Sequence, residues 1–152
     1  MNILRKFFYK KHGTERGYVR HILANLEHDL GRLQSFEQPQ LEKVNRIVFV
    51  CLGNICRSAY GHCFALKTAF PLPIASIGLS TTTGVPANNV AIKVADEREV
   101  NMHQHKATDL SEFEVQDGDL FLVMEVRQAH QLTLKLKDYE NIQIALLGSF
   151  CS

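Results

Sequence analysis

One short segment, residues 47–58, constrains the fold of this chain more than any other part. Its sequence is Ile-Val-Phe-Val-Cys-Leu-Gly-Asn-Ile-Cys-Arg-Ser. The first four residues predict a buried parallel strand, because the run is too short for a helix and too apolar for a half-exposed strand. Gly53 and Asn54 tolerate the positive φ values that turn a backbone sharply. A helix is predicted from Arg57 to about Phe70, so the segment predicts a strand, a tight loop and a helix.

The loop in this segment has the chemistry of an anion site. Unpaired N–H groups and the positive dipole end of the predicted helix favour a bound dianion, and they favour a thiolate over a thiol. A cysteine placed there, Cys51, is expected to have a lowered pKa. Arg57, six positions later, offers a planar fork for two phosphate oxygens. The alternative, in which Cys51 is only a buried apolar residue, leaves Arg57 and Ser58 unexplained.

The spacing Cys-x5-Arg-Ser resembles the phosphate loop of the low-molecular-weight protein tyrosine phosphatases. The usual sequence of that loop is Val-Cys-x-Gly-Asn-x-Cys-Arg-Ser, and residues 50–58 match it at every position. It is not a Walker loop, because no Gly-Lys-Ser/Thr follows. The resemblance continues in order to about residue 150 through the segments Ala75–Leu79 (second strand), Gly84–Ala87 (loop), His105–Ala107, Asp119–Met124 (third strand) and Ile144–Phe150 (fourth strand).

The order of these segments predicts the fold class. Strands and helices alternate from residue 45 onward, which predicts a parallel sheet with helices on both faces. The remaining helices are expected at Asn88–Glu99 and Arg127–Lys137. The resemblance implies an α/β three-layer sandwich whose four-stranded parallel sheet has the order 2-1-3-4. Ligands bind such sheets beyond the carboxyl ends of the strands, where the Cys51 loop falls.

The resemblance implies hydrolysis of protein tyrosine phosphate in two steps. The Cys51 thiolate attacks phosphorus, the loop and Arg57 hold the oxygens, and water then hydrolyses the cysteinyl phosphate. Ser58 is expected to hydrogen-bond the Cys51 sulfur, which stabilises it as a leaving group. The alternative for Ser58 alone is an ordinary helix-start residue.

The phosphate-binding residues are expected to be the loop itself, namely Leu52, Gly53, Asn54, Ile55, Cys56 and Arg57. Asn54 is further expected to brace the loop. Family resemblance adds Ser76 and His105 as supports behind it. No metal or cofactor is expected, because N–H donors and a guanidinium already offset the phosphate charge and no zinc-type Cys or His spacing is present.

Cys56 is a candidate redox residue, because it lies five positions from Cys51 in the same loop. A reversible disulfide between the two would trap the oxidised nucleophile before irreversible oxidation. The alternative is a packed thiol with no redox role. The sequence leaves both interpretations open.

The family's general acid is an aspartate in an Asp-Pro loop downstream of Leu-Gly-Ser, and no aspartate follows Asp138 here. Without that acid the rate is expected to fall by about 10² to 10⁴. The favoured expectation is that the 152 residues are part of a longer product, because residues 146–150 lead to the place of the acid loop. The alternatives are a phosphate-binding pseudo-phosphatase or interaction module and, less favoured, a thiol-dependent arsenate reductase, for which Cys63 and Cys151 sit poorly.

Residues 1–44 have no counterpart in the family pattern and are expected to form a basic, amphipathic helical extension to a phosphatase-like domain at 45–152. The apolar stripe of the extension is Val19, Ile22, Leu23, Leu26, Leu30 and Leu33, at helical spacing. Gln38-Pro39 marks a break before the domain. Residues 1–20 carry six lysines and arginines against one glutamate, a net charge of +5. The extension is expected to pack on the domain or a second subunit, and the alternative is an anionic membrane surface.

Composition limits the setting and the partners. The chain has 45% hydrophobic and 22% charged residues, as expected for one ordinary core. It has no run of eighteen or more apolar residues, and its four cysteines lack paired secretory spacing. A cytoplasmic location, with the membrane surface as an option, is therefore expected. The expected partner is a phosphotyrosine protein, by family association a bacterial tyrosine kinase of exopolysaccharide synthesis. Nucleic acid is not expected, since no binding motif accompanies the basic cluster.

Overall fold

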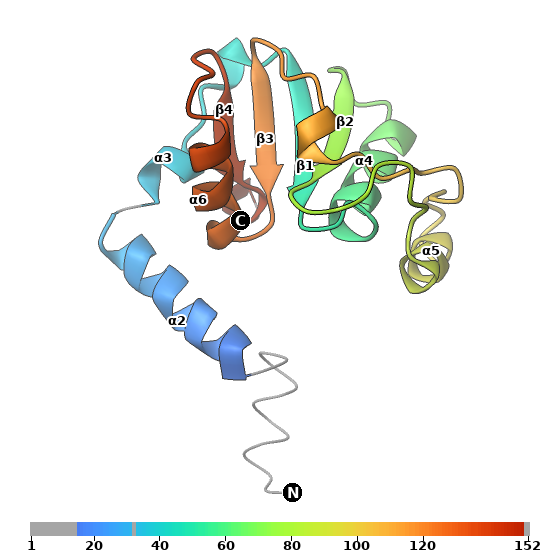
Figure 1. Cartoon of the computed structure of the whole chain (residues 1–152), viewed down its shortest axis with the longest axis horizontal. Coiled ribbons are helices and arrows are strands. Elements are labelled where there is room, and N and C mark those ends of the chain that lie inside the picture. The colour runs from blue at the N-terminus through green and yellow to red at the C-terminus, as the bar shows by residue number, and fades with distance from the viewer. Residues whose placement is uncertain (1–14, 32, 151–152) are drawn as a thin grey trace, which may run out of the picture. The chain divides into compact units, whose positions relative to one another are not determined.

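The structure is a computed structural model that describes residues 15–31 and 33–150 (Figure 1). The chain divides into two compact units, residues 1–35 and residues 36–152. The first unit contains helix α2 (Glu15–Asp29), and the short helix α3 (Gln34–Glu37) spans the division. The second unit contains the sheet and carries the loop around Cys51.

The second unit is built on four parallel strands in the order β2-β1-β3-β4. Both the parallel α/β fold and this order confirm the prediction from the sequence. In the register of the sheet, Cys51 lies beside Gly78, and Val50 lies between Ile77 and Val123. The strands are β1 (Arg46–Cys51), β2 (Ile74–Gly78), β3 (Asp119–Val123) and β4 (Gln143–Leu146).

The helices of this unit agree with the expected positions, with small differences at their ends. α5 begins one residue later than predicted because Asn88 is its N-cap, whose side chain accepts hydrogen bonds from the N–H groups of Val90 and Ala91. The helix also ends at Asp96, before the predicted end at Glu99. The helices are α4 (Arg57–Lys67), α5 (Asn89–Asp96) and α6 (Val126–Lys135), with 3-10 turns η1 (Leu41–Lys43), η2 (Leu110–Glu112) and η3 (Leu147–Phe150).

The predicted fourth strand was wrong in its second half. The sequence predicted a strand over Ile144–Phe150, whereas β4 ends at Leu146 and residues 147–150 form η3. β3 ends at Val123, whose partner is Leu146, so no strand edge remains for the next residues to pair with. The Ser149 hydroxyl instead donates to the Leu146 carbonyl at 2.6 Å, which supports the turn.

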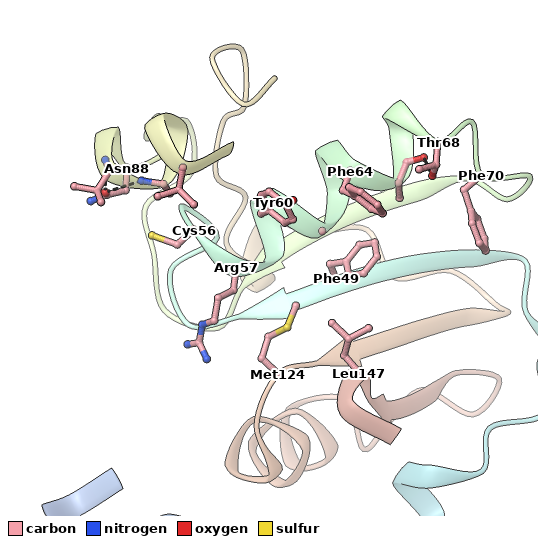
Figure 2. Close-up of a pocket in the computed structure, with 15 residues that line it drawn as sticks. Phe49, Cys56, Arg57, Tyr60, Phe64, Thr68, Phe70, Asn88, Met124 and Leu147 are labelled. Atoms are coloured by element: carbon pink, nitrogen blue, oxygen red, sulfur yellow. Dashed lines mark hydrogen bonds between the residues drawn. The ribbon is translucent and has the colours of Figure 1, made fainter. Parts of the chain in front are cut away.

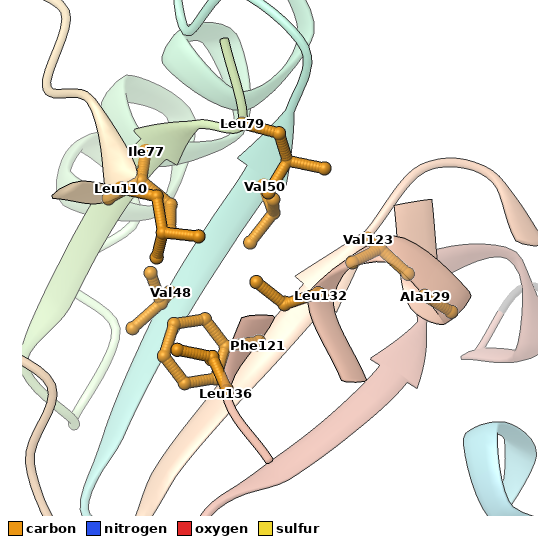
Figure 3. Packing of buried hydrophobic residues seen from close by; sticks show 10 residues of the cluster. All are labelled: Val48, Val50, Ile77, Leu79, Leu110, Phe121, Val123, Ala129, Leu132 and Leu136. Carbon is orange, nitrogen blue, oxygen red and sulfur yellow. The ribbon is translucent and has the colours of Figure 1, made fainter. Parts of the chain in front are cut away.

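The two faces of the sheet are covered by different helices. Val48, Val50 and Phe121 point to the face that α6 covers, where they pack with Leu132 (Figure 3). Phe49 points to the opposite face, where α4 crosses so closely that a Cβ on Gly61 would lie 2.8 Å from the Phe49 ring. Because strand side chains alternate between faces, β1 packs against helices on both sides of the sheet, and this packing fixes the position of its end.

Residues 36–44 contribute to the α/β unit. Phe36 packs against the cluster under α6, and Val44 is buried in the cluster on the other face. The expected boundary lay after residue 44, whereas the compact unit begins at Phe36. The assignment of residues 1–44 as a separate functional extension stays a prediction.

Helix α2 contains most of the expected apolar stripe. Val19, Leu23 and Leu26 are each more than half exposed, as is Leu30 just beyond the helix. Four of the six lysines and arginines counted in residues 1–20 fall in residues 1–14, outside the described residues. None of the described helices is long and apolar enough to cross a bilayer.

Candidate active site

The loop of residues 52–56 joins the end of β1 to the start of α4. Neighbouring segments hold its carbonyl groups from outside. The N–H groups of Ser80 and Asn88 donate to the carbonyls of Leu52 and Ile55, both at 2.9 Å, and Leu79 N–H donates to the Cys51 carbonyl at 3.0 Å. With these carbonyls held by neighbouring segments, the backbone N–H groups of Gly53, Asn54 and Ser58 hydrogen-bond the Cys51 sulfur, as expected for an anion cradle.

Gly78, at the end of β2, lets the loop approach the sheet edge. A Cβ at this position would lie 2.9 Å from the Leu52 carbonyl oxygen and 3.0 Å from the Gly53 carbonyl carbon. Both contacts are with loop backbone, which has no side-chain freedom to move aside. The glycine therefore sets the distance between the loop and β2.

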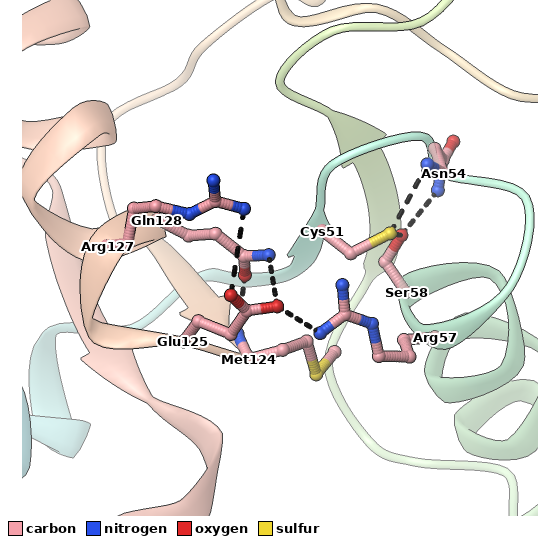
Figure 4. A network of polar contacts seen from close by, with 8 residues as sticks. All are labelled: Cys51, Asn54, Arg57, Ser58, Met124, Glu125, Arg127 and Gln128. Carbon is pink, nitrogen blue, oxygen red and sulfur yellow. Dashed lines mark hydrogen bonds and ion pairs between the residues drawn. The ribbon is translucent and has the colours of Figure 1, made fainter. Parts of the chain in front are cut away.

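Cys51 lies at the centre of this loop with its sulfur in a ring of donors. The side chain is buried, and its Sγ lies 3.0 Å from the Ser58 hydroxyl and 3.3 Å from the Asn54 N–H (Figure 4). Burial alone would raise the pKa of the Cys51 thiol, but hydrogen bonds from the Ser58 hydroxyl and from backbone N–H groups outweigh it. The net effect lowers the Cys51 pKa, which favours the thiolate as a nucleophile.

Asn54 connects the loop to the rest of the fold. Its backbone has a φ of 50°, in the left-handed region that asparagine tolerates better than most residues. The side chain is fully buried and its amide nitrogen donates to the hydroxyls of Ser58 and Ser76, both at 2.9 Å. Its side-chain oxygen Oδ1 accepts a hydrogen bond from the Thr108 N–H at 2.9 Å. The structure thus brings Asn54 and Ser76 together, as expected for loop supports.

His105 contacts the same loop from the segment after α5. Its Nε2 lies 2.8 Å from the backbone carbonyl oxygen of Asn54. Burial lowers the pKa of His105, and the hydrogen bond to Asn54 opposes that effect in part. A neutral His105 can donate this hydrogen bond from its Nε2–H, so the contact suits a support rather than a charged phosphate ligand.

Arg57 begins α4 and is half exposed beside the loop. Its Nη1 lies 2.6 Å from a carboxylate oxygen of Glu125, which follows the end of β3 (Figure 4). Arg127 and Gln128 also contact this carboxylate, at 3.7 and 3.5 Å. Arg57 is therefore at the mouth of the cradle with its charge balanced by an acidic residue.

Cys56 is partly exposed and is a free thiol in this structure. Burial and the neighbouring Cys51 charge raise the pKa of Cys56, while Arg57 opposes them. The two cysteines of the loop therefore differ, because the pKa of Cys51 is lowered and the pKa of Cys56 is raised. The predicted disulfide between them stays a prediction.

The sequence around this loop and the fold that carries it are matched in known proteins. Residues 46–152 match the sequence model of the family described as "Low molecular weight phosphotyrosine protein phosphatase". The chain belongs to this family. The family's phosphate loop is the segment that surrounds Cys51.

Two relatives show how far the similarity extends. The chain is 45% identical over 83 residues to the "Probable low molecular weight protein-tyrosine-phosphatase AmsI" of Erwinia amylovora, covering 54% of this chain and 57% of that protein. It is 35% identical over 88 residues to the "Low molecular weight protein-tyrosine-phosphatase Wzb" of Escherichia coli K12, covering 58% and 60%. The chain thus spans less than two thirds of the length of these relatives.

Solved structures of such phosphatases share the fold. The crystal structure of the Erwinia amylovora tyrosine phosphatase AmsI superposes with a TM-score of 0.59 at 34% identity, covering 72% of each chain. Vibrio vulnificus Wzb in complex with benzylphosphonate superposes with a TM-score of 0.58 at 31% identity, covering 68% of this chain and 73% of that one.

An apolar groove lies beside the phosphate loop. It encloses about 770 Å³ and extends from Arg57 along α4 toward Phe70 (Figure 2). Tyr60 and Phe64 stack on this side of α4, with ring centres 6.1 Å apart. Met124 lies across from them, near Arg57. An aromatic leaving group next to the cradle would meet apolar side chains here.

The site contains residues that reasoning from the sequence missed. Glu125 pairs with Arg57, His62 hydrogen-bonds Ser76, and Thr108 orients the Asn54 amide. Only Glu125 had a signal, because it follows a predicted strand on the edge where ligands bind. Within residues 15–31 and 33–150, no cluster of three His, Cys, Asp or Glu side chains has metal-binding geometry.

Proposed function

We propose that this chain hydrolyses tyrosine phosphate in proteins through a cysteinyl phosphate at Cys51. The observation that carries the proposal is the ring of donors around the Cys51 sulfur at the start of α4. A thiolate stabilised by Ser58 and loop N–H groups is a nucleophile, and the same N–H groups would stabilise the oxygens of a phosphate bound to it. Membership of the phosphatase family supports this reading.

In the first step the thiolate forms the S–P bond and the P–O bond to tyrosine breaks, so the electron pair leaves with the phenolic oxygen. Water then attacks phosphorus, the S–P bond breaks, and the Cys51 thiolate returns as inorganic phosphate departs. The Ser58 hydroxyl stabilises the sulfur in both steps. Arg57 exchanges Glu125 for phosphate oxygens, which is feasible because a half-exposed ion pair contributes only about 0 to 1 kcal/mol.

Hydrolysis of p-nitrophenyl phosphate tests this proposal. Its leaving group departs readily without a proton, so the assay depends on the nucleophile and cradle that the chain contains. We expect turnover by the wild type and none above background by Cys51→Ser. Cys63→Ser is the matched control, because Cys63 is a free thiol on α4 outside the cradle, and it should keep full activity. Equal rates for wild type and Cys51→Ser would refute the proposal.

We further propose a phosphotyrosine protein as the physiological substrate, with a bacterial tyrosine kinase as the specific candidate. Support comes from the family alone. The test is dephosphorylation of an autophosphorylated bacterial tyrosine kinase by active enzyme, read by anti-phosphotyrosine blot. Loss of signal with wild type but not with Cys51→Ser is expected. Retention of the full signal in the presence of active enzyme would exclude the kinase as substrate.

For the extension, we propose a contact between α2 and a second subunit, with binding to a membrane surface as the alternative. The exposed apolar side chains of α2 support a contact role. Sedimentation velocity of wild type and Leu26→Glu tests it: a concentration-dependent dimer lost in the variant is expected. A wild type that stays monomeric but co-sediments with anionic vesicles would favour the membrane instead.

We propose a protective role for Cys56 and a location in a reducing compartment, the cytoplasm. The proximity of two loop cysteines with opposite pKa shifts supports the role. Peroxide inactivation that dithiothreitol reverses in wild type, but not in Cys56→Ser, is expected. Equal recovery of the two proteins would leave Cys56 as a packed thiol.

A further inference from the structure

His62 is a polar residue behind the loop that the mechanism above does not use. It lies on α4 one turn after Ser58, on the same side of the helix. Its Nδ1 is 3.0 Å from the Ser76 hydroxyl oxygen. Its ring meets that of His105 edge to face, with ring centres 6.1 Å apart.

The directions of the hydrogen bonds around Asn54 can be worked out from one fixed donor. The Thr108 backbone N–H can only donate, so the Asn54 atom facing it is the carbonyl oxygen. The Asn54 amide nitrogen therefore faces Ser58 and Ser76 and donates one hydrogen to each. Both serine oxygens are then acceptors, and each serine still has its own hydrogen to place.

Each of these two serine hydrogens has a partner in the structure. Ser58 directs its hydrogen to the Cys51 sulfur at 3.0 Å, the shorter of its two remaining contacts; the Ile77 carbonyl lies at 3.4 Å. The remaining contact of Ser76 is Nδ1 of His62, so we assign the Ser76 hydrogen to that nitrogen. That contact needs an Nδ1 without a proton, hence a neutral imidazole with its hydrogen on Nε2.

We propose that His62 is a positioning residue for the Cys51 nucleophile. When His62 accepts the Ser76 hydrogen, the lone pairs of the Ser76 oxygen are directed toward the Asn54 amide. The Asn54 amide in turn orients the Ser58 hydroxyl toward the Cys51 sulfur. This role of His62 rests on the proposed function, in which Cys51 is the nucleophile. His62 contacts Ser76 and His105, so it acts on Cys51 through these partners.

The surroundings of His62 keep it neutral. Burial lowers the pKa of His62, and the nearby His105 lowers it further. The other ionisable side chains around the same cavity, of about 410 Å³, are Lys106 and Cys63. None of them is a carboxylate that would stabilise a protonated imidazole. A proton on Nδ1 would remove the acceptor that Ser76 uses.

The test measures the Cys51 thiolate directly and needs no phosphatase activity. Alkylation of Cys51 by iodoacetamide is followed against pH by mass spectrometry, which separates Cys51 from the other cysteines. His62→Phe keeps a ring but removes the acceptor. In this variant we expect the pH midpoint of Cys51 alkylation to rise by about half a unit. The fraction of Cys51 present as thiolate would then be about threefold lower at pH values below the midpoint.

Two further variants separate positioning from packing. His62→Asn places an amide oxygen near the position of Nδ1, so it should keep the wild-type midpoint. His103→Phe replaces an exposed histidine and should also leave it unchanged. An unchanged midpoint in His62→Phe, or an equal shift in His62→Asn, would overturn the proposal.

A measurement on the wild type keeps the proposal testable even if His62→Phe fails to fold. Nitrogen-15 NMR of the imidazole at pH 7 reports which ring nitrogen carries the hydrogen. The proposal requires an unprotonated Nδ1, and an Nδ1–H tautomer would overturn it. Failure of the proposed function would give a different result: the wild type would show the lowered alkylation midpoint of Cys51 but would not hydrolyse p-nitrophenyl phosphate.

Discussion

Ser58 combines two roles in one hydroxyl group, because it accepts a hydrogen from Asn54 and donates its own to the Cys51 sulfur. A hydrogen bond to a charged group contributes about 1.5 to 3 kcal/mol. We therefore predict that Ser58→Ala raises the Cys51 pKa by about one unit, measured by the pH dependence of iodoacetamide alkylation. Ser149→Ala removes a hydroxyl far along the chain in η3 and should leave the Cys51 pKa unchanged. An unshifted profile in Ser58→Ala would contradict the role given to this residue.

Glu125 competes with the bound anion for Arg57 and adds a negative charge at the mouth of the cradle. We predict that Glu125→Gln tightens binding of inorganic phosphate or vanadate by about threefold, a modest effect because the ion pair is partly exposed. Inhibition of p-nitrophenyl phosphate hydrolysis measures it. Glu97→Gln, at an exposed position after α5, is the control. Weaker binding in Glu125→Gln would mean that the carboxylate instead holds Arg57 in its productive position.

At this scale the sequence identified the residues that lie within one contiguous loop. The positions of Cys51, Asn54 and Ser58 follow from local spacing, and the structure brings them into contact. Glu125 and His62 were missed because their partners lie 68 and 14 positions away in the chain. Such pairs depend on how strands and helices pack, which no local pattern encodes.

Among the elements, the end of β2 supports the phosphate loop. A Cβ on Gly78 would meet two loop backbone atoms and, at 2.8 Å, the Thr81 methyl group. We predict that Gly78→Ala displaces the loop, weakens vanadate binding by about tenfold, and lowers the free energy of unfolding by about 1 to 3 kcal/mol. Vanadate inhibition and urea denaturation measure the two effects.

The matched control is Gly148→Ala, since nothing lies within 4 Å of a Cβ there and its φ is not in the left-handed region. It should change neither vanadate binding nor stability by a measurable amount. Wild-type vanadate affinity in Gly78→Ala would show that the loop does not depend on close contact with β2.

The elements themselves were largely predictable, because apolar runs and helical spacing are local signals. The prediction failed at the end of β4, where Leu147 and Phe150 look like strand residues but have no partner strand beyond Val123. Pairing is a property of the neighbouring strand, so an apolar stretch alone could not show where it stops.

For the whole molecule, His62 and His105 connect stability to pH. Burial lowers the pKa of both below the ordinary value of 6.5, so the folded state binds fewer protons than the unfolded state. Their stability contribution is complete above about pH 6.5 and is lost as the pH falls through the folded-state values. We predict a falling free energy of unfolding from pH 7 to pH 5 in urea titrations, with a shallower slope in His62→Asn and His105→Asn. Identical slopes in all three proteins would contradict this prediction.

Catalysis through a cysteinyl phosphate requires that phosphate become attached to Cys51 during turnover. Wild type is mixed with p-nitrophenyl phosphate, quenched within milliseconds and analysed by peptide mass spectrometry, with Cys51→Ala as control. We expect a phosphate on Cys51 that appears with the first release of p-nitrophenolate and is absent from the control. Substrate consumption with an unmodified Cys51, or with phosphate on another side chain, would contradict it.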